Sequence, residues 1–268
     1  MPYLMVNDVE LYVEIEGEGE PVLLIHGLGG NTTQMRQTMK RLSSFYKTIA
    51  YDCRGHGLSE KPASYTLEDH IRDALALMDE LGMARAAVLG VSGGSYIAQG
   101  LAAAEPDRVK RLVLVVARAY GAKSSTQLFF ERHAAAMAKL GEKEKAAYFI
   151  DRVFAPGFLD NMQPAQLQTL MVPEPALTAE QTEAANRAFE GFDLRPALPR
   201  IQAPTLVLSG KYDGLNPPAC GTEIADGIPD ATFVEMRHSG HAPSFEEPDR
   251  FYRLVIDFLN AKGGDFHE

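Results

Sequence analysis

Residues 90–94 read Gly-Val-Ser-Gly-Gly, which fits the pattern Gly-x-Ser-x-Gly and places a serine where it could act as a nucleophile. The pattern lies between an apolar run, residues 86–89, and a segment with helical spacing, and this strand–turn–helix setting makes it credible. A serine in so sharp a turn has a strained backbone, so the residues two before and two after it must be small. Ser92 meets this condition, whereas Ser95 is followed two residues later by Ile97. We therefore predict Ser92 as the nucleophile; the alternative is a glycine-rich turn without chemistry.

A serine hydroxyl is a weak nucleophile unless a base takes its proton and a third group orients that base. Two histidines, His238 and His241, follow the last apolar run and precede the last helical segment. His-x-x-His could also bind a metal ion, but no third ligand is evident, and we expect no metal site. Asp213 follows the penultimate apolar run, and the loop after residues 112–116 offers no carboxylate, so Asp213 is the best acid; it could instead form only an Asp-Gly turn. The chain order Ser, Asp, His agrees with a Gly-x-Ser-x-Gly turn on an α/β sheet.

Two further polar loops follow apolar runs. Residues 26–30, His-Gly-Leu-Gly-Gly, would let backbone N–H groups face a ligand, but Thr32 stands where a dinucleotide motif needs a third glycine, and no phosphate-loop motif occurs. We therefore expect no cofactor. Asp52 and His56 lie in a glycine-bounded turn, where such side chains commonly satisfy the turn's own backbone, and we interpret both as structural.

Short, continuously apolar runs alternate with helical segments along most of the chain. The runs are residues 22–25, 48–51, 87–89, 112–116, 205–208 and 231–234, and helical spacing is clearest at 66–81 and 250–259. Strands of this kind are covered on both faces, and their alternation with helices implies an open, mostly parallel and twisted α/β sheet. Residues 3–6 and 11–16 flank an Asn-Asp turn and predict an N-terminal antiparallel hairpin. In such a sheet, ligands bind beyond the carboxyl ends of the strands.

One interval, residues 120–195, has helical patterns but no convincing strand. We predict that it forms a helical cap, inserted after the sixth strand over the active edge of a core domain made of residues 1–119 and 196–268. Its aromatic and methionine side chains suit an apolar pocket, although we expect most of them to pack within the cap. The tail, residues 263–268, is expected to be frayed.

The composition is that of a soluble globular protein, with a net charge of −10 over 268 residues. A nucleic acid or an anionic membrane surface would need a clustered basic face, which the scattered lysines and arginines do not provide. Two cysteines, Cys53 and Cys220, predict free thiols in a reducing compartment. No leader sequence or membrane-length apolar run is evident, so we expect a cytoplasmic protein that acts on a small-molecule substrate. The sequence carries no signal for an oligomeric state.

Several stretches together resemble the α/β-hydrolase superfamily, in its serine-nucleophile branch, over essentially the whole chain outside the cap. They are His26-Gly27-Leu28-Gly29, Asp52-x-Arg54-Gly55-His56-Gly57-x-Ser59, Gly90-x-Ser92-x-Gly94, Gly210-x-x-Asp213 and Gly240-His241-x-x-x-x-Glu246-x-Pro248. The resemblance implies an α/β-hydrolase fold in which Ser92 attacks, His241 rather than His238 moves the proton, and Asp213 orients the imidazole. It also implies an oxyanion hole formed by the backbone N–H groups of Leu28 and Gly93.

With serine rather than aspartate as the nucleophile, acyl transfer to water is the expected chemistry. We predict a hydrolase of small-molecule carboxylic esters or lactones that forms an acyl-enzyme on Ser92. The alternatives are a C–C bond hydrolase of aromatic degradation, a cofactor-free haloperoxidase or perhydrolase, and a ligand receptor that keeps the triad with little turnover. Residues predicted to line the substrate pocket are His26, Arg118, Tyr120, Phe130, Met137 and Phe149. Arg118 and Tyr120 could bind a substrate carboxylate, but we expect instead that both side chains are exposed to solvent.

Overall fold

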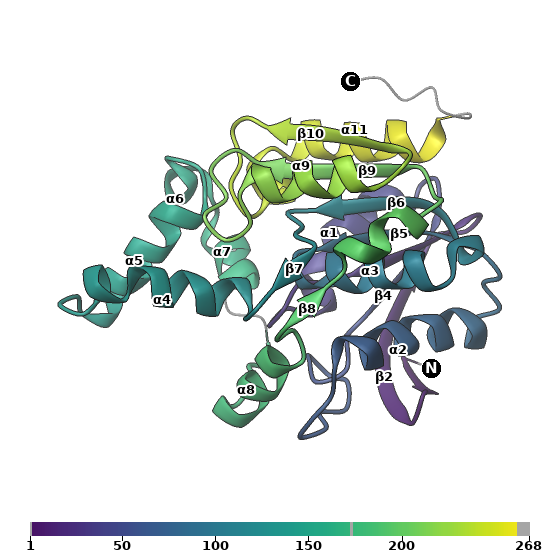
Figure 1. Cartoon of the computed structure of the whole chain (residues 1–268), viewed down its shortest axis with the longest axis horizontal. Helices are drawn as coiled ribbons and strands as arrows, with labels where there is room; N and C mark the ends of the chain where they lie inside the picture. The colour runs from purple at the N-terminus through teal and green to yellow at the C-terminus, as the bar shows by residue number, and fades with distance from the viewer. Residues whose placement is uncertain (1, 172–173, 262–268) are drawn as a thin grey trace.

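An eight-stranded sheet forms the centre of the protein (Figure 1). The computed structural model describes residues 2–171 and 174–261, so the predicted frayed tail lies outside the described residues. The strand order is β1-β2-β4-β3-β5-β6-β9-β10; the pairs β1–β2 and β2–β4 are antiparallel and the others are parallel. The expected mostly parallel sheet with an N-terminal hairpin is therefore confirmed. The strands are β1 (Tyr3–Val6), β2 (Val9–Glu16), β3 (Pro21–Ile25), β4 (Lys47–Tyr51), β5 (Ala86–Val91), β6 (Val109–Val115), β9 (Thr205–Gly210) and β10 (Ala231–Met236).

Helices connect these strands and cover both faces of the sheet (Figure 1). None of the helices in the described part of the chain is long and apolar enough to cross a membrane. The core helices are α1 (Thr32–Leu42), α2 (Leu67–Glu80), α3 (Gly93–Ala104), α9 (Pro218–Gly227), α10 (Pro243–Glu246) and α11 (Pro248–Asn260), with 3-10 turns η1 (Pro106–Arg108) and η2 (Arg195–Arg200).

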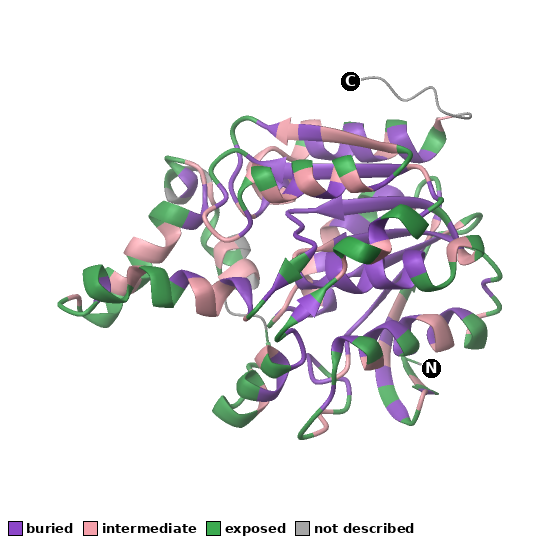
Figure 2. Ribbon diagram, viewed as in Figure 1, coloured by how far each residue is buried: buried purple, intermediate pink, exposed green. Residues whose placement is uncertain are grey.

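The inner strands are buried because their side chains alternate between two apolar layers (Figure 2). In β3, Leu23 and Ile25 join a cluster with residues of α2, α3 and α9. Val22 and Leu24 point to the other face and join a cluster with residues of α1 and α11. An apolar run without alternation therefore encodes a strand that is covered on both sides.

The parallel strands bring the loops that follow them to one edge of the sheet. Ser92 directly follows β5, and Val116 directly follows β6. Asp213 and His241 lie in the loops after β9 and β10, the pair at the end of the sheet. The residues that the sequence marks as reactive therefore meet at the carboxyl edge, as the strand pattern predicts.

The helical cap leaves the core after β6 and returns to it before β9 (Figure 1). Its outgoing and returning segments pair as two-residue antiparallel strands, which we had not expected because such short strands carry no apolar run. Several of its aromatic side chains, among them Phe129, Phe154 and Phe158, pack in a separate apolar cluster, as expected. We propose that the short pair marks the boundaries of the cap, residues 120–195. The cap elements are β7 (Tyr120–Gly121), α4 (Ser125–Met137), α5 (Glu142–Val153), α6 (Phe158–Asn161), α7 (Pro164–Met171), α8 (Ala179–Arg187) and β8 (Phe192–Asp193).

A buried ion pair fastens the N-terminal hairpin to the core. Arg54 Nη2 lies 2.6 Å from Asp73 Oδ1, and Arg54 Nε lies 2.8 Å from Asp73 Oδ2, which makes the pair bidentate. Asn7, in the hairpin turn, donates its side-chain N–H to Asp73 and accepts from Arg54 through its carbonyl. The pair therefore joins the hairpin, the loop after β4 and helix α2.

Replacing the buried Asp73 with alanine would leave the half-buried Arg54 guanidinium without its carboxylate partner, so we expect the free energy of unfolding to fall by about 3 kcal/mol. Asp79→Ala is the matched control, because the Asp79 side chain is 67% exposed in its pair with Arg108. We expect it to cost less than about 1 kcal/mol. Urea unfolding gives both values, and equal losses would contradict the structural role of the buried pair.

Three buried histidines form a row that ends at the cap. The ring centroids of His26 and His56 lie 5.3 Å apart, those of His56 and His70 lie 6.2 Å apart, and His70 stacks on Phe189 at 5.4 Å. Burial lowers the pKa of His26 to about 4 and that of His56 to about 3, and it holds the pKa of His70 well below its usual value. All three rings are therefore neutral at pH 7.

These depressed pKa values make the protein acid-sensitive. The unfolded chain binds protons on these histidines below about pH 6.5, whereas the folded chain resists them until much lower pH, so stability falls as the pH decreases through this window. We expect each histidine to contribute a slope of about 1.4 kcal/mol per pH unit to the free energy of unfolding. His70→Phe keeps a ring against Phe189 and should reduce the slope by one such contribution. An unchanged slope in urea titrations between about pH 5 and pH 6.5 would contradict this.

Candidate active site

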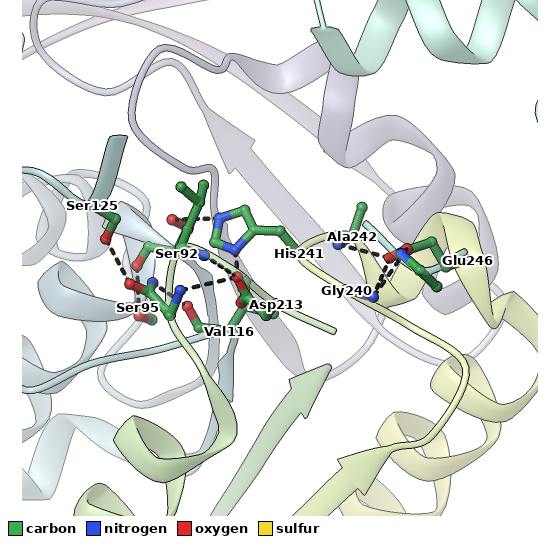
Figure 3. Close-up of polar contacts among 12 residues, drawn as sticks. Ser92, Ser95, Val116, Ser125, Asp213, Gly240, His241, Ala242 and Glu246 are labelled. Carbon is green, nitrogen blue, oxygen red and sulfur yellow. Dashed lines mark hydrogen bonds and ion pairs between the residues drawn. The ribbon is translucent and has the colours of Figure 1, made fainter. Parts of the chain in front are cut away.

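Ser92 lies at the turn between β5 and α3 with a left-handed backbone, φ +50° and ψ −117° (Figure 3). The turn is possible because its flanking residues lack side chains. A Cβ added to Gly90 would lie 2.3 Å from the carbonyl oxygen of Gly94, and one added to Gly94 would lie 2.2 Å from the carbonyl oxygen of Ile25. Ser95 faces inward and donates its hydroxyl to the carbonyl oxygen of Ser92 at 2.5 Å, so it supports the turn.

His241 lies between Ser92 and Asp213 (Figure 3). Its Nδ1 lies 2.8 Å from Asp213 Oδ2, and its Nε2 lies 3.1 Å from Ser92 Oγ. Because an ionised carboxylate only accepts hydrogen bonds, Nδ1 carries the proton and Nε2 is free to accept the proton of the serine hydroxyl. His238, the alternative base, is exposed, and its backbone N–H donates to Glu247. The structure therefore brings together the three residues that the sequence and the resemblance select.

Asp213 both forms a turn and orients the histidine. Its Oδ1 accepts from the backbone N–H groups of Leu215 and Asn216, at 2.8 and 2.9 Å, while Oδ2 accepts from His241. The side chain is buried, and the two amides hold it in one orientation. The turn interpretation and the orienting interpretation are therefore compatible, because they use different oxygens of one carboxylate.

Asn216 links the Asp213 loop to the cap through a closed ring of hydrogen bonds, which the sequence did not reveal. Its Nδ2 donates to the carbonyl oxygen of Val116 at 2.7 Å and to Tyr96 Oη at 3.1 Å. Its Oδ1 accepts from Ser125 Oγ at 2.6 Å, and Tyr96 Oη lies 3.2 Å from Ser125 Oγ. Because Ser125 donates to the amide oxygen, the Tyr96 hydroxyl is the donor to Ser125. Every N–H and O–H group of these three side chains therefore donates a hydrogen bond, either within the ring or to the Val116 carbonyl.

Glu246 holds the other side of the His241 loop (Figure 3). Its carboxylate accepts from the backbone N–H groups of Gly240 at 2.7 Å and Ala242 at 3.3 Å, on either side of the histidine. It also accepts from Ala155 in the cap at 2.9 Å, while the His241 N–H donates to the carbonyl oxygen of Val153 at 2.8 Å. Burial raises the pKa of Glu246, and the three N–H donors oppose that rise. The sequence pattern contains Glu246 but does not indicate this contact with the cap.

The backbone N–H groups of Leu28 and Gly93 lie beside Ser92. A Cβ added to Gly93 would lie 2.9 Å from the Leu28 nitrogen, so the two segments touch. Gly93 is the first residue of α3, where a backbone N–H has no acceptor within the helix. Neither N–H donates to any acceptor in the described part of the chain. Both donors are thus available to an oxygen atom placed between them.

A cavity of about 230 Å³ lies over Ser92 and His241, between the core and the cap. This volume is below the range of about 300–1,000 Å³ that is typical of pockets for drug-sized ligands. Two further cavities share lining residues with it, one through Leu28, Thr126 and Met171 and the other through Gln34, Leu170 and His241. The apolar lining of the main cavity is Leu28, Val91, Phe149, Val153, Phe154, Leu170, Met171, Phe189, Leu215 and Ala242.

Of the six residues predicted to line the pocket, Phe149 does so. Met137 is buried in the apolar cluster of the cap, and Phe130 is 45% exposed and stacks on the ring of Phe149. Tyr120 is also exposed and packs under the guanidinium of Arg195, 4.1 Å from its ring centroid. Phe130 and Met137 differ from the prediction because α4 turns one face to the apolar cluster of the cap and another to solvent, whereas Tyr120 lies on the short strand β7.

His26 and Arg118 also lie away from the main cavity. The Nε2 of His26 accepts from the backbone N–H of Cys53 at 2.9 Å, so Nδ1–H donates to the Gly27 carbonyl and both nitrogens serve the backbone. Arg118 is buried rather than solvated, which corrects our expectation. Its guanidinium donates to the carbonyl oxygen of Lys123 and packs over the rings of Tyr96 and Phe192.

The residues interpreted as structural have that role. Asp52 accepts from the backbone N–H groups of Thr32 at 2.6 Å and Leu58 at 2.7 Å, and His56 Nδ1–H donates to the Arg54 carbonyl at 2.9 Å.

Both cysteines, Cys53 and Cys220, are free thiols. Across residues 2–171 and 174–261, no group of three or more His, Cys, Asp or Glu side chains could hold a metal ion.

Comparison with known proteins confirms the family resemblance. A family model described as alpha/beta hydrolase fold matches residues 20–248. The crystal structure of the enol-lactonase from Burkholderia xenovorans superimposes on this protein with a TM-score of 0.83. The two sequences are 33% identical, and the alignment covers 97% of this chain and 100% of the enol-lactonase chain. The 3-oxoadipate enol-lactonase 2 of Acinetobacter baylyi is 28% identical over 94% of each protein. The pimeloyl-[acyl-carrier protein] methyl ester esterase of Aliivibrio salmonicida is 28% identical over 94% of this chain and 97% of that protein. These similarities support hydrolase activity.

The contacts of Glu246 predict that it positions His241. Glu246→Gln keeps the size of the side chain but replaces one accepting oxygen with a donor, so part of the N–H set loses its acceptor. We expect a fluorophosphonate to label Ser92 roughly tenfold to a hundredfold more slowly, because small displacements of a base weaken its action strongly. Labelling is followed by intact mass. Glu80→Gln, at an exposed residue ending α2, is the control. We expect the rate of Ser92 labelling to fall while the melting temperature of the variant stays near that of the wild type. A lowered melting temperature with an unchanged labelling rate would assign Glu246 to stability alone.

Proposed function

Because the chain belongs to the α/β-hydrolase fold family, we propose that it is a serine hydrolase that cleaves a small-molecule carboxylic ester or lactone through an acyl-enzyme on Ser92. The observation that carries this proposal is the hydrogen-bonded relay from Ser92 Oγ through His241 to Asp213. Family membership alone leaves the reaction open, since one fold hosts many activities, so the geometry of the site is the stronger support.

The first step is acylation. Ser92 Oγ passes its proton to His241 Nε2 and forms a bond to the carbonyl carbon, while the π electrons move to the carbonyl oxygen. Asp213 stabilises the imidazolium that results. The oxyanion accepts hydrogen bonds from the N–H groups of Leu28 and Gly93, each contributing about 3 kcal/mol to transition-state stabilisation. The C–O bond to the leaving group then breaks, and imidazolium Nε2–H protonates the departing oxygen.

The second step is deacylation. His241 takes a proton from water, whose oxygen attacks the acyl carbon, and Ser92 recovers its proton when the ester bond to the enzyme breaks. In a lactone, the leaving oxygen of the first step stays attached to the acyl chain, so a hydroxy acid is released as one product. No step needs a metal ion or a redox group.

The same relay could serve the alternative reactions, and the names of the relatives do not separate them. Among the similar proteins, two are named as enol-lactonases and one as a methyl ester esterase. Others are named as putative carbamate hydrolases and putative non-heme bromoperoxidases. A receptor that keeps the relay would acylate Ser92 without sustained turnover. The ratio of turnover to acylation therefore separates the receptor from the enzyme.

Ser92→Ala should abolish hydrolysis of p-nitrophenyl butyrate, since loss of a nucleophile in comparable triads costs on the order of a millionfold in kcat. Ser95→Ala removes the other hydroxyl of the turn and should still form the butyryl ester on Ser92. Release of p-nitrophenol measures turnover, and mass spectrometry of peptides from rapidly quenched protein locates the butyryl group.

Two results would change the proposal. A single burst of p-nitrophenol without further release would favour the receptor. Hydrolysis that survives Ser92→Ala, or a butyryl group found on Ser95, would overturn the assignment of the nucleophile.

A further inference from the structure

The described lining of the cavity over Ser92 carries no charged side chain. Among the described residues that line it and its two neighbours, none is Asp, Glu, Lys or Arg. His241 is the basic side chain of the described lining, and in the relay it is the proton acceptor. A substrate anion in this cavity would therefore meet no cationic partner.

Two carboxyl groups hold His241, that of Asp213, which is buried, and that of Glu246, which is half-buried. Asp213 lies 2.8 Å from its Nδ1, and Glu246 binds the backbone N–H groups on both sides of it (Figure 3). Arg118, the buried cation that the sequence suggested for a substrate carboxylate, packs over the ring of Tyr96 and donates to the Lys123 carbonyl. The side chains that hold His241 therefore supply no cation to a substrate anion.

The hydroxyl groups of the lining offer little compensation. Tyr96 and Ser125 face the cavity, but their protons are committed within the ring that they form with Asn216. Each can accept a hydrogen bond from a ligand, and neither can donate one without breaking the ring. The free backbone donors of Leu28 and Gly93 lie beside Ser92, where the carbonyl oxygen must bind. A carboxylate elsewhere on the substrate would meet neutral donors at most, such as the Thr126 hydroxyl, and no cation among the described lining residues, so its loss of hydration would be only partly compensated.

From this geometry, and resting on the proposed function, we propose that the substrate has a short, apolar and uncharged acyl group. Esters and lactones whose acyl part carries a carboxylate are excluded. The main cavity of about 230 Å³ sets the size limit, and its apolar lining from the core and the cap provides the binding energy. The polar side chains of the described lining are neutral apart from His241, which suits a neutral ester or a substrate hydroxyl.

The test compares two esters of equal chain length and the same leaving group, p-nitrophenyl pentanoate and the p-nitrophenyl monoester of glutaric acid. They differ in that a carboxylate replaces the terminal methyl group. With the wild-type protein at neutral pH, and with spontaneous hydrolysis subtracted, we expect kcat/KM for the glutarate to be lower by on the order of a hundredfold. Hydrolysis of neither ester would reject the proposed function. Hydrolysis of both at similar rates would support that function and overturn the charge selection.

A cation placed in the cavity should relax the selection. Met171→Lys adds one beside the main cavity with a side chain of similar length, and Met171→Gln is the neutral polar control. We expect the ratio of glutarate to pentanoate turnover to rise roughly tenfold or more in the lysine variant and to stay near the wild-type ratio in the glutamine variant. The ratio cancels any general loss of activity from altered packing. An equal ratio in all three proteins would contradict an electrostatic origin.

Discussion

The close approach of two backbone segments around Ser92 determines the geometry of the site. Gly94 packs against the carbonyl oxygen of Ile25 at the end of β3, and Gly90 packs against the carbonyl oxygen of Gly94, so neither position tolerates a side chain. The pairing of β3 with β5, in which Ile25 lies opposite Gly90, sets this approach. The same pairing carries the loop with Leu28 to the first turn of α3. A left-handed serine, and two N–H donors that have no acceptor within the described part of the chain, therefore arise from one packing constraint.

The histidine depends on a second set of contacts, which reach into the cap. Asp213 orients its ring, whereas Glu246 and the Val153 carbonyl fix its backbone. The end of α5 is thus bonded to the loop that carries His241. His241 is therefore held in position by hydrogen bonds to residues of both the core and the cap.

The polar groups around the cavity are mostly engaged with one another. The protons of Asn216, Tyr96 and Ser125 are used within their ring or by the Val116 carbonyl, and Gln34 donates its amide to the Leu170 carbonyl. Buried polar groups that are satisfied internally stabilise one arrangement of the site, but they leave few donors for a ligand. The surface presented to a substrate is therefore largely apolar, apart from the relay and the two backbone donors.

Local patterns in the sequence were enough to predict the sheet, and they pointed to Ser92, to Asp213 and to two candidate histidines; the family resemblance selected His241 over His238. The reason is physical: a strained turn needs glycines at fixed spacing, strands buried on both faces read as apolar runs, and loops after parallel strands share one edge. The roles of Asn216 and Glu246 were not predictable, because their partners lie in the cap and in distant loops. The same holds for the pocket lining, where Phe149 lines the cavity and its neighbour in the stack, Phe130, faces solvent. Sequence by itself determined which groups could react; only the tertiary structure decided what surrounds them, since the direction of each side chain is set by packing between segments far apart in the chain.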